Sequence, residues 1–342
     1  MDQPDLSRAS HAVLLLASHL GDSTEDADQT RIGPAAWYDV ERIIAESPMD
    51  SPGELIHLPE PDWPEEVRQY FSNNPEIIPR LKRAGSLAME IADFNDRGIW
   101  VTTKFEESYP IHFLKTLGRK APPYLYISGS VDNLKPKAVS FVGSRDCTTE
   151  DKTYTQRVVR KAIEDGYSVV SGGARGIDTI AQEAGLDNDG CVVEFPAQGL
   201  GTLISKKEIR EPISAGNLTL VSSYNPQASW TIGGAMGRNK YIHGFSSYSV
   251  VVRSGDESGG TWAGATENLQ HGWSTVLVCT HLEPVPGNLK LIDMGAVSID
   301  PTNIPEDVPF SEWVPDGGEM NRQGVDDPVS SSEKQLDLGD FN

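Results

Sequence analysis

The sequence predicts an α/β protein with an extended, doubly wound and mainly parallel sheet, preceded by a small helical N-terminal domain. Short apolar runs of strand length recur after residue 133, and helix-compatible stretches of about ten to twenty residues separate most of them. Glycine-rich turns follow several of these runs. Continuous apolar strands of this kind are typical of a parallel sheet that helices cover on both faces. Such a sheet binds its ligands beyond the carboxyl ends of its strands.

Residues 1–115 are expected to form the small helical domain. Apolar residues recur there at helical spacing, with Asp, Ser and Pro between the segments. The expected helices are 11–20, 37–45, 64–71 and 76–93. Residues 99–102 are a candidate strand. Residues 116–135, which contain the Pro-Pro-Tyr-Leu-Tyr run, are expected to form a connector and the first extended segment.

Residues 136–305 are expected to form the doubly wound, Rossmann-like domain. In its first crossover, Thr148 or Thr149 caps a helix that runs to about Asp165, and Gly166 ends it. The candidate strands are 138–142, 168–170, 191–195, 218–221, 248–252 and 275–279. Residues 306–342 contain many acidic side chains and few apolar ones, which predicts a disordered acidic tail.

Composition narrows the range of functions. A formal net charge of −21 repels nucleic acids and membrane surfaces at long range, so binding to a polyanion requires a local basic pocket. Cys147, Cys191 and Cys279 are odd in number and far apart, which favours neither a disulfide framework nor a zinc site. No metal or cofactor is therefore expected. The apolar run at 11–20 is too short to span a membrane and is unlike a signal peptide, so a cytoplasmic location is predicted.

The chain is organised around the stretch Ser171-Gly172-Gly173-Ala174-Arg175, which follows two buried-type valines. It predicts the end of a strand, a tight turn and the start of a helix. Glycines let a backbone approach a ligand closely, and free N–H groups at a helix start favour an anion. Arg175 adds a positive charge to the turn. Asp178, just inside the helix, is expected to have a structural role beside the helix dipole or an arginine.

Three further segments are expected at the same edge of the sheet. Gly143, Ser144 and Arg145 end the first strand of the domain, and Arg238, Asn239 and Lys240 belong to the helix that precedes strand 248–252. Ser258 and Gly259 follow that strand and open the next helix. Each motif alone is weak, but together they predict one cleft that binds a phosphate-bearing ligand.

These motifs, in this order, resemble those of the DprA (Smf) family of DNA-processing proteins. The similarity is dense from about 136 to 297, where it also includes the run Gly287-Asn288-Leu-Lys-Leu-Ile-Asp-Met-Gly295-Ala296. The resemblance implies a cytoplasmic, non-enzymatic protein that binds single-stranded DNA in a basic pocket of an extended Rossmann fold. It also implies a homodimer and a RecA recombinase partner in transformation or recombination. The residues that it assigns to the DNA backbone are Gly143, Ser144, Arg145, Ser171, Gly172, Gly173, Arg175, Arg238, Asn239, Lys240, Ser258 and Gly259.

Tyr241, Phe245 and Trp262 are candidate platforms for stacking with bases, and packing in the core is the competing interpretation of each. The sequence departs from the family pattern at several points. Ala235-Met236-Gly237 stand where additional arginines are usual, and Gln182 stands where a histidine is common. Gly272-Trp273 replaces a Gly-Arg pair, and no winged-helix pattern follows residue 300.

Two other functions remain open. The run from Ser258 to Glu267 is similar to the Pro-Gly-Gly-x-Gly-Thr-x-x-Glu loop of nucleoside-monophosphate phosphoribohydrolases, although the leading proline and the Gly-Thr pair are missing. In a nucleotide N-glycosidase or a nucleotide sensor of that kind, Glu267 would polarise the sugar or activate water. The third interpretation is a defence-associated or regulatory relative that kept the scaffold and exchanged its ligand.

Overall fold

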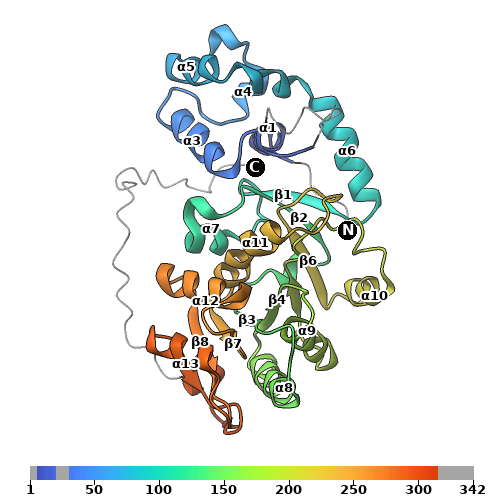
Figure 1. Ribbon diagram of the computed structural model, residues 1–342. Coiled ribbons are helices and arrows are strands. Elements are labelled where there is room, and N and C mark those ends of the chain that lie inside the picture. Colours follow the sequence, from blue (N-terminus) through green and yellow to red (C-terminus); the bar gives the residue numbers. More distant parts are fainter. Residues whose placement is uncertain (1–5, 21–30, 315–342) are drawn as a thin grey trace.

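The computed structural model describes residues 6–20 and 31–314 (Figure 1). Its centre is a nine-stranded sheet with the order β1-β2-β6-β5-β4-β3-β7-β8-β9. The seven strands from β6 to β9 in that order pair in parallel, whereas β2 pairs antiparallel with both β1 and β6. The strands are β1 Trp100–Thr103, β2 Tyr124–Ser128, β3 Ala138–Val142, β4 Ser168–Ser171, β5 Val192–Glu194, β6 Leu218–Ser222, β7 Tyr248–Val251, β8 Thr275–Cys279 and β9 Val297–Ile299.

Helices precede the sheet and connect its strands. Those ahead of β1 gather at one end of the molecule, next to β1 and β2 (Figure 1): α1 Arg8–Ala17, α3 Pro34–Ala45, α4 Glu54–His57, η1 Glu60–Asp62, α5 Glu65–Asn73, η2 Pro75–Lys82 and α6 Ala84–Asp96. The others are α7 Ile111–Leu117, η3 Gly118–Lys120, η4 Val131–Asn133, α8 Thr149–Glu164, α9 Ile177–Asp187, α10 Lys207–Ala215, α11 Ile232–Phe245, α12 Gly259–His271, α13 Pro286–Asp293 and α14 Phe310–Trp313.

The predicted fold class is confirmed, and each of the candidate strands from 99–102 to 275–279 coincides with a strand of the sheet. Within the segment 116–135, which was expected to be extended, Tyr124–Ser128 form β2 inside the sheet. Pro122 and Pro123 precede this strand and leave its N–H groups free to pair. Strand β9 is only three residues long and gave no recognisable pattern.

Alternating side chains of the parallel strands enter two separate cores. Val139 and Phe141 of β3 point into the core that contains α8 and α9, together with residues of the N-terminal helices. Ala138 and Val142 point into the core that contains α7, α11, α12 and α13. This burial on both faces explains why the strands appear in the sequence as continuous apolar runs.

A buried arginine fixes the first helix. Arg80 is 1 % exposed, and its guanidinium donates from Nε to the Leu15 carbonyl (2.7 Å) and from Nη2 to the Ser18 carbonyl (2.6 Å). It therefore satisfies carbonyl groups at the end of α1 that no helical N–H can reach. The helix predicted at 76–93 is in fact two elements, η2 and α6, which separate at Arg83. Pro79 lies within the first of them and has no N–H for an α-helical ladder.

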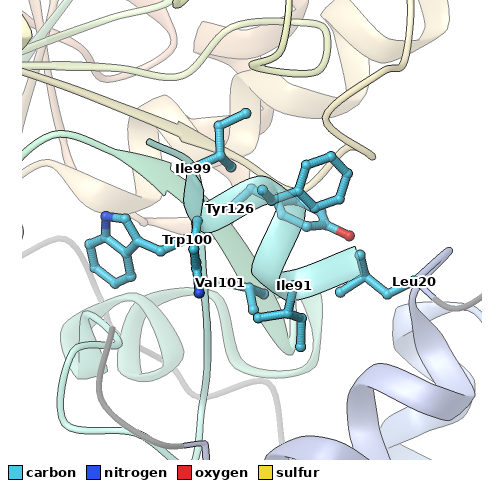
Figure 2. Close-up of a pocket in the computed structure, with 8 residues that line it drawn as sticks. Leu20, Ile91, Ile99, Trp100, Val101 and Tyr126 are labelled. Carbon is cyan, nitrogen blue, oxygen red and sulfur yellow. The ribbon is translucent and has the colours of Figure 1, made fainter. Parts of the chain in front are cut away.

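The N-terminal helices pack directly against the sheet. Figure 2 shows a narrow apolar pocket between α6 and the β1–β2 edge, where Ile91 lies beside Val101 and Tyr126. Phe94 also lines this pocket, which is too small to admit a water molecule. Phe94 and Tyr126 meet edge to face with 6.3 Å between ring centroids. The pocket is part of the packing between helices and sheet, and it has no space for a ligand.

The predicted disordered tail is wrong for its first residues. Helix α14 lies at Phe310–Trp313, and Phe310 is fully buried between Tyr167 (5.3 Å between centroids) and Tyr248 (5.4 Å). Aromatic packing therefore includes α14 in the fold, and residues 315–342 of the predicted tail lie outside the described residues. The domain boundaries at 115, 135 and 305 stay predictions. Within the described ranges, no helix has the length and apolar character needed to cross a bilayer.

Replacement of Arg80 by Met is expected to lower the free energy of unfolding by about 3 kcal/mol, because two buried carbonyl groups lose their donors. Urea denaturation measures the change. The matched control is Arg42→Met. Among the described residues, the exposed Arg42 side chain pairs only with Glu46 (3.2 Å), so this variant should change stability by less than about 1 kcal/mol. Equal effects of the two variants would contradict the role of Arg80 at the end of α1.

Candidate nucleic-acid interface

The predicted phosphate-binding loops meet at the carboxyl edge of the sheet. Strand β3 lies between β4 and β7, and the chain proceeds from β3 to β4 on one side and later adds β7 on the other. This arrangement is the topological switch point at which open α/β sheets bind ligands. We call residues 143–145, 171–178 and 258–261, together with Glu194 and Arg238, the carboxyl-edge cluster.

Hydrogen bonds join the three loops of the carboxyl-edge cluster. The Thr261 hydroxyl, in the first turn of α12, donates to the Gly143 carbonyl (3.0 Å). The Ile177 N–H, at the start of α9, donates to the Ser144 carbonyl (3.3 Å). Arg175 also pairs with Asp146 across the two loops, with 2.8 Å between Nη2 and Oδ1. The loops after β3, β4 and β7 therefore form one connected surface.

Two glycines allow this close approach. Gly176 has φ of +95°, and a Cβ there would overlap the backbone oxygen of Ser144. A Cβ at Gly143 would overlap the side chain of Ile177. Gly176 is required by its positive φ and by the contact, and Gly143 by the contact alone, so the glycines of these loops follow from the packing.

Arg238 lies beneath the second loop. It is 6 % exposed, and its Nη2 donates to the Gly172 carbonyl (3.1 Å). Burial lowers the pKa of Arg238, and the neighbouring carboxylates of Asp178 and Glu194 oppose this effect. The family resemblance assigned Arg238 to contact with the DNA backbone. In the structure its buried side chain instead contacts the loop after β4 through the Gly172 carbonyl.

Asp178 has the predicted structural role. Its carboxylate accepts the N–H groups of Gly172 (3.1 Å) and Ala174 (3.4 Å), so it fixes the turn after β4. Burial raises the pKa of Asp178, and the charge of Arg238 and these N–H groups act against the increase.

Glu194 is the residue that sequence reasoning missed. It ends β5, opposite Ser171 of β4, and is 4 % exposed. Burial raises its pKa to about 7, with Arg238 opposing and Asp178 adding to the increase. A carboxylic acid inside the apolar run 191–195 was the available signal, because a strand that is buried on both faces has no solvent for a charge.

Exposed groups complete the carboxyl-edge cluster. Arg145 is exposed and makes no hydrogen bond or ion pair with any described residue, and Arg175 is exposed beside Asp146. Gly259, with φ of +85°, opens α12, and no side chain caps this helix. The predicted residues Ser144 and Ser258 lie in these loops. Such a helix start and an unpaired guanidinium both favour an anion.

Two buried polar atoms of the cluster have no partner among the described residues. They are the hydroxyl of Ser171 and Nε of Arg238, and both side chains are less than a tenth exposed. Buried polar atoms are normally hydrogen-bonded, so each of these two atoms has a free position for one hydrogen-bond partner.

Lys240 lies apart from the cluster. It follows Arg238 by two residues on α11, which turns its side chain by about 200° around the helix. Its Nζ lies 5.1 Å from the Tyr241 ring centroid. Burial lowers the pKa of Lys240, Glu267 opposes this and Lys120 adds to it, so these three charges lie near one another. Asn239 does reach the cluster, where its side-chain N–H donates to the Gly260 carbonyl (3.1 Å).

The phosphoribohydrolase alternative requires a carboxylate near the phosphate loops. Glu267 is eight residues beyond Gly259 in α12, which places it about 12 Å further along the helix axis. It lies near Lys240 rather than near Arg238. The geometry therefore gives no support to a glycosidase in which Glu267 acts at the carboxyl-edge cluster.

The aromatic candidates for stacking belong to the core. Tyr241 and Phe245 are buried with α7 in one of the two hydrophobic cores, and half-buried Trp262 packs against that core. Trp230 lies just ahead of α11 and is 48 % exposed. It was not among the candidates for stacking that the sequence suggested.

Asp151 of α8 anchors the carboxyl edge from below. Its carboxylate accepts hydrogen bonds from Arg253 after β7 (2.7 Å), from His281 after β8 (2.9 Å) and from the Thr148 N–H (2.8 Å). Burial pushes the pKa of Asp151 upward, but these hydrogen bonds outweigh it and hold the pKa below its ordinary value. The ionised carboxylate therefore stabilises the fold.

The Asp151→Asn variant should be less stable than the wild type near neutral pH, and the difference should shrink in acid. A carboxyl whose pKa is lower in the folded state contributes stability above its unfolded pKa, about 4, and loses it as pH falls through the folded pKa. Urea unfolding at pH 7, 5 and 3.5 measures this trend. A difference in stability that did not change with pH would contradict it.

Known proteins resemble this chain in sequence and in fold. Residues 100–308 match the family described as DNA recombination-mediator protein A. DNA processing protein DprA of Streptococcus pneumoniae is 33 % identical over 140 residues, or 41 % of this chain and 49 % of that protein. DprA of Bacillus subtilis is 25 % identical over 238 residues, or 68 % of this chain and 75 % of that protein. The match thus spans about half the length of the S. pneumoniae relative.

The X-ray structure of DprA from S. pneumoniae has the same fold, with a TM-score of 0.55, 21 % identity, and coverage of 78 % of this chain and 95 % of that chain. The family match covers more than half of this chain and includes the loops after β3, β4 and β7. The chain is therefore a member of the DNA recombination-mediator protein A family, also called DprA or Smf.

Proposed function

We propose that this protein binds single-stranded DNA through backbone phosphates at the carboxyl-edge cluster and acts as a non-catalytic recombination mediator. The observation that carries the proposal is the exposed, unpaired guanidinium of Arg145 beside two glycine loops and the uncapped start of α12. Arginine, backbone N–H groups and helix starts are the groups that bind phosphate without reading a sequence.

The residues of the cluster have different tasks in this proposal. Arg145 and Arg175 contact phosphate directly, together with N–H groups of the loops at 143–145 and 171–175 and of the turn at 258–259. Arg238 holds the Gly172 loop in place and adds a positive charge beneath it. The unpartnered hydroxyl of Ser171 gives the loop a further polar group.

Lys240 and Lys120 form a second basic area on the opposite side of α11. A DNA strand that extends past the carboxyl-edge cluster would reach it as a secondary contact. Homodimer formation and delivery of the bound strand to a RecA recombinase, which membership of the family suggests, belong to the same proposal, as does a cytoplasmic location.

The Arg145→Ala variant is expected to bind a labelled oligothymidylate about three- to tenfold more weakly at low salt. It should also reduce the slope of log K against log salt by about 0.7, the value for one phosphate contact to a single strand. Fluorescence anisotropy at several salt concentrations measures both quantities. Lys240→Ala should have a smaller effect. The matched control is Lys207→Ala on α10. Within the part of the chain that the structure describes, this exposed lysine pairs only with Glu211 (3.5 Å).

Failure of the wild type to bind the oligonucleotide at low salt would overturn the proposal. So would equal affinities of the Arg145→Ala and Lys207→Ala variants, because a non-specific effect of charge would then explain the binding. Binding of mononucleotides without binding of single-stranded DNA would instead favour a relative that kept the scaffold and exchanged its ligand.

A further inference from the structure

The carboxyl-edge cluster contains two buried carboxylates, which oppose the binding of an anion. The carboxylates of Asp178 and Glu194 both lie beside the single guanidinium of Arg238, beneath the loop that contains Gly172 and Gly173. Glu194 is directly under this loop, because a Cβ at Gly173 would overlap its carboxylate. With both acids ionised, the three buried groups carry a net charge of −1 where a phosphate is proposed to bind.

The two carboxylates are not equally supported. Asp178 accepts two backbone N–H groups, which favour its charged form. Glu194 has no backbone donor among the described residues, and its hydrogen-bond partner is the side chain of Gln182 on α9. Lys206, ahead of α10, faces it as a further charge. Two more titratable groups, Tyr224 and Arg145, act on Arg238. Among these groups, Glu194 is the one that can become neutral most readily.

We propose that single-stranded DNA binding at the carboxyl-edge cluster takes up one proton at Glu194, so that Arg238 faces the bound phosphate with only one opposing carboxylate. Glu194 is then a positioning residue that acts through Arg238 and the Gly172–Gly173 loop. This inference rests on the proposed function, since it requires a phosphate at that loop.

The direction of the pH effect follows from the charges. Burial raises the pKa of Glu194 to about 7 in the free protein. A phosphate above Gly173 disfavours the ionised carboxylate further, so the pKa of Glu194 is higher in the complex than in the free protein. Binding is therefore strongest below pH 7, where Glu194 is already neutral, and weakens as pH rises through 7. One linked proton can change affinity by up to about tenfold per pH unit.

The test compares wild type and Glu194→Gln in binding to a rhodamine-labelled oligothymidylate at pH 6, 7 and 8 and constant ionic strength. Neither the DNA phosphates nor thymine titrates in this range. We expect the dissociation constant of the wild type to rise about three- to tenfold from pH 6 to pH 8. Glu194→Gln should stay near the wild-type value at pH 6 throughout. Glu208→Gln, on the exposed side of α10, removes the same charge elsewhere and should follow the wild type.

Calorimetry gives a second readout that a purely structural role of Glu194 would not change. Titration at pH 7.5 in two buffers of different ionisation enthalpy should show proton uptake on binding for the wild type and none for Glu194→Gln. If that variant fails to fold, Gln182→Leu serves instead. It removes the amide donor that favours the carboxylate, so it should move the pH dependence to higher pH.

The outcomes separate the two proposals. Wild-type binding with the same pH profile as Glu194→Gln, or no proton uptake by the wild type, would overturn the role of Glu194 and leave the proposed function intact. Absence of wild-type binding at every pH would overturn the proposed function itself.

Discussion

The contact between the Arg238 guanidinium and the Gly172 carbonyl is the constraint on which the carboxyl edge depends. A buried cation is costly unless carboxylates and hydrogen bonds compensate for its lost hydration. Asp178 and Glu194 supply the negative charge, and Asp178 also holds the loop through two N–H groups. The shape of the loop and the balance of buried charge are therefore coupled, so a change in one changes the other.

This coupling is relevant to the proposed phosphate site, because the chain is so acidic. With a formal net charge of −21, the surface as a whole repels nucleic acid, and attraction has to come from short-range groups. Backbone N–H groups and a helix start act at contact distance and add no net charge. In the proposed site, a small number of oriented donors around Arg145 take the place of a broad basic surface, and the Arg238 guanidinium beside them is held by the Gly172 carbonyl.

Much of the fold could be predicted from the sequence because its strands are buried on both faces. The runs from 138–142 to 275–279 are predominantly apolar, with single polar residues such as Ser140 and Thr219 inside them, and helix α8 has its capping box at the predicted Thr148. Strand β2 was expected only as an extended segment, because the prolines before it obscure its boundary. Strand β9 was missed because its three residues include an exposed serine and do not form an apolar run. The interruption between η2 and α6 depends on Pro79, whose effect on a helix varies with tertiary context.

The candidate site could be located from the sequence, but the roles of its side chains could not. Loop glycines indicate a close approach, and the loops do meet. The motif Arg238-Asn239-Lys240 looks like three ligands of one site, yet helical geometry turns Arg238 and Lys240 to different sides of α11. Glu194 lies in a predicted strand, and the sequence pattern gave it no further role. Only the tertiary fold brings it under the loop that follows the neighbouring strand β4.

The position of β1 has a consequence for how the protein can be divided. Trp100–Thr103 precedes the predicted boundary at 115, yet it pairs with β2 along its whole length. A fragment that began after residue 115 would leave β2 as an uncovered edge strand, open to pairing with a second molecule. It would also remove the helices whose side chains share one continuous core with β3 and α8. The helical region and β1 thus cover the β2 edge of the sheet. A fragment suited to biophysical work therefore has to start upstream of α1.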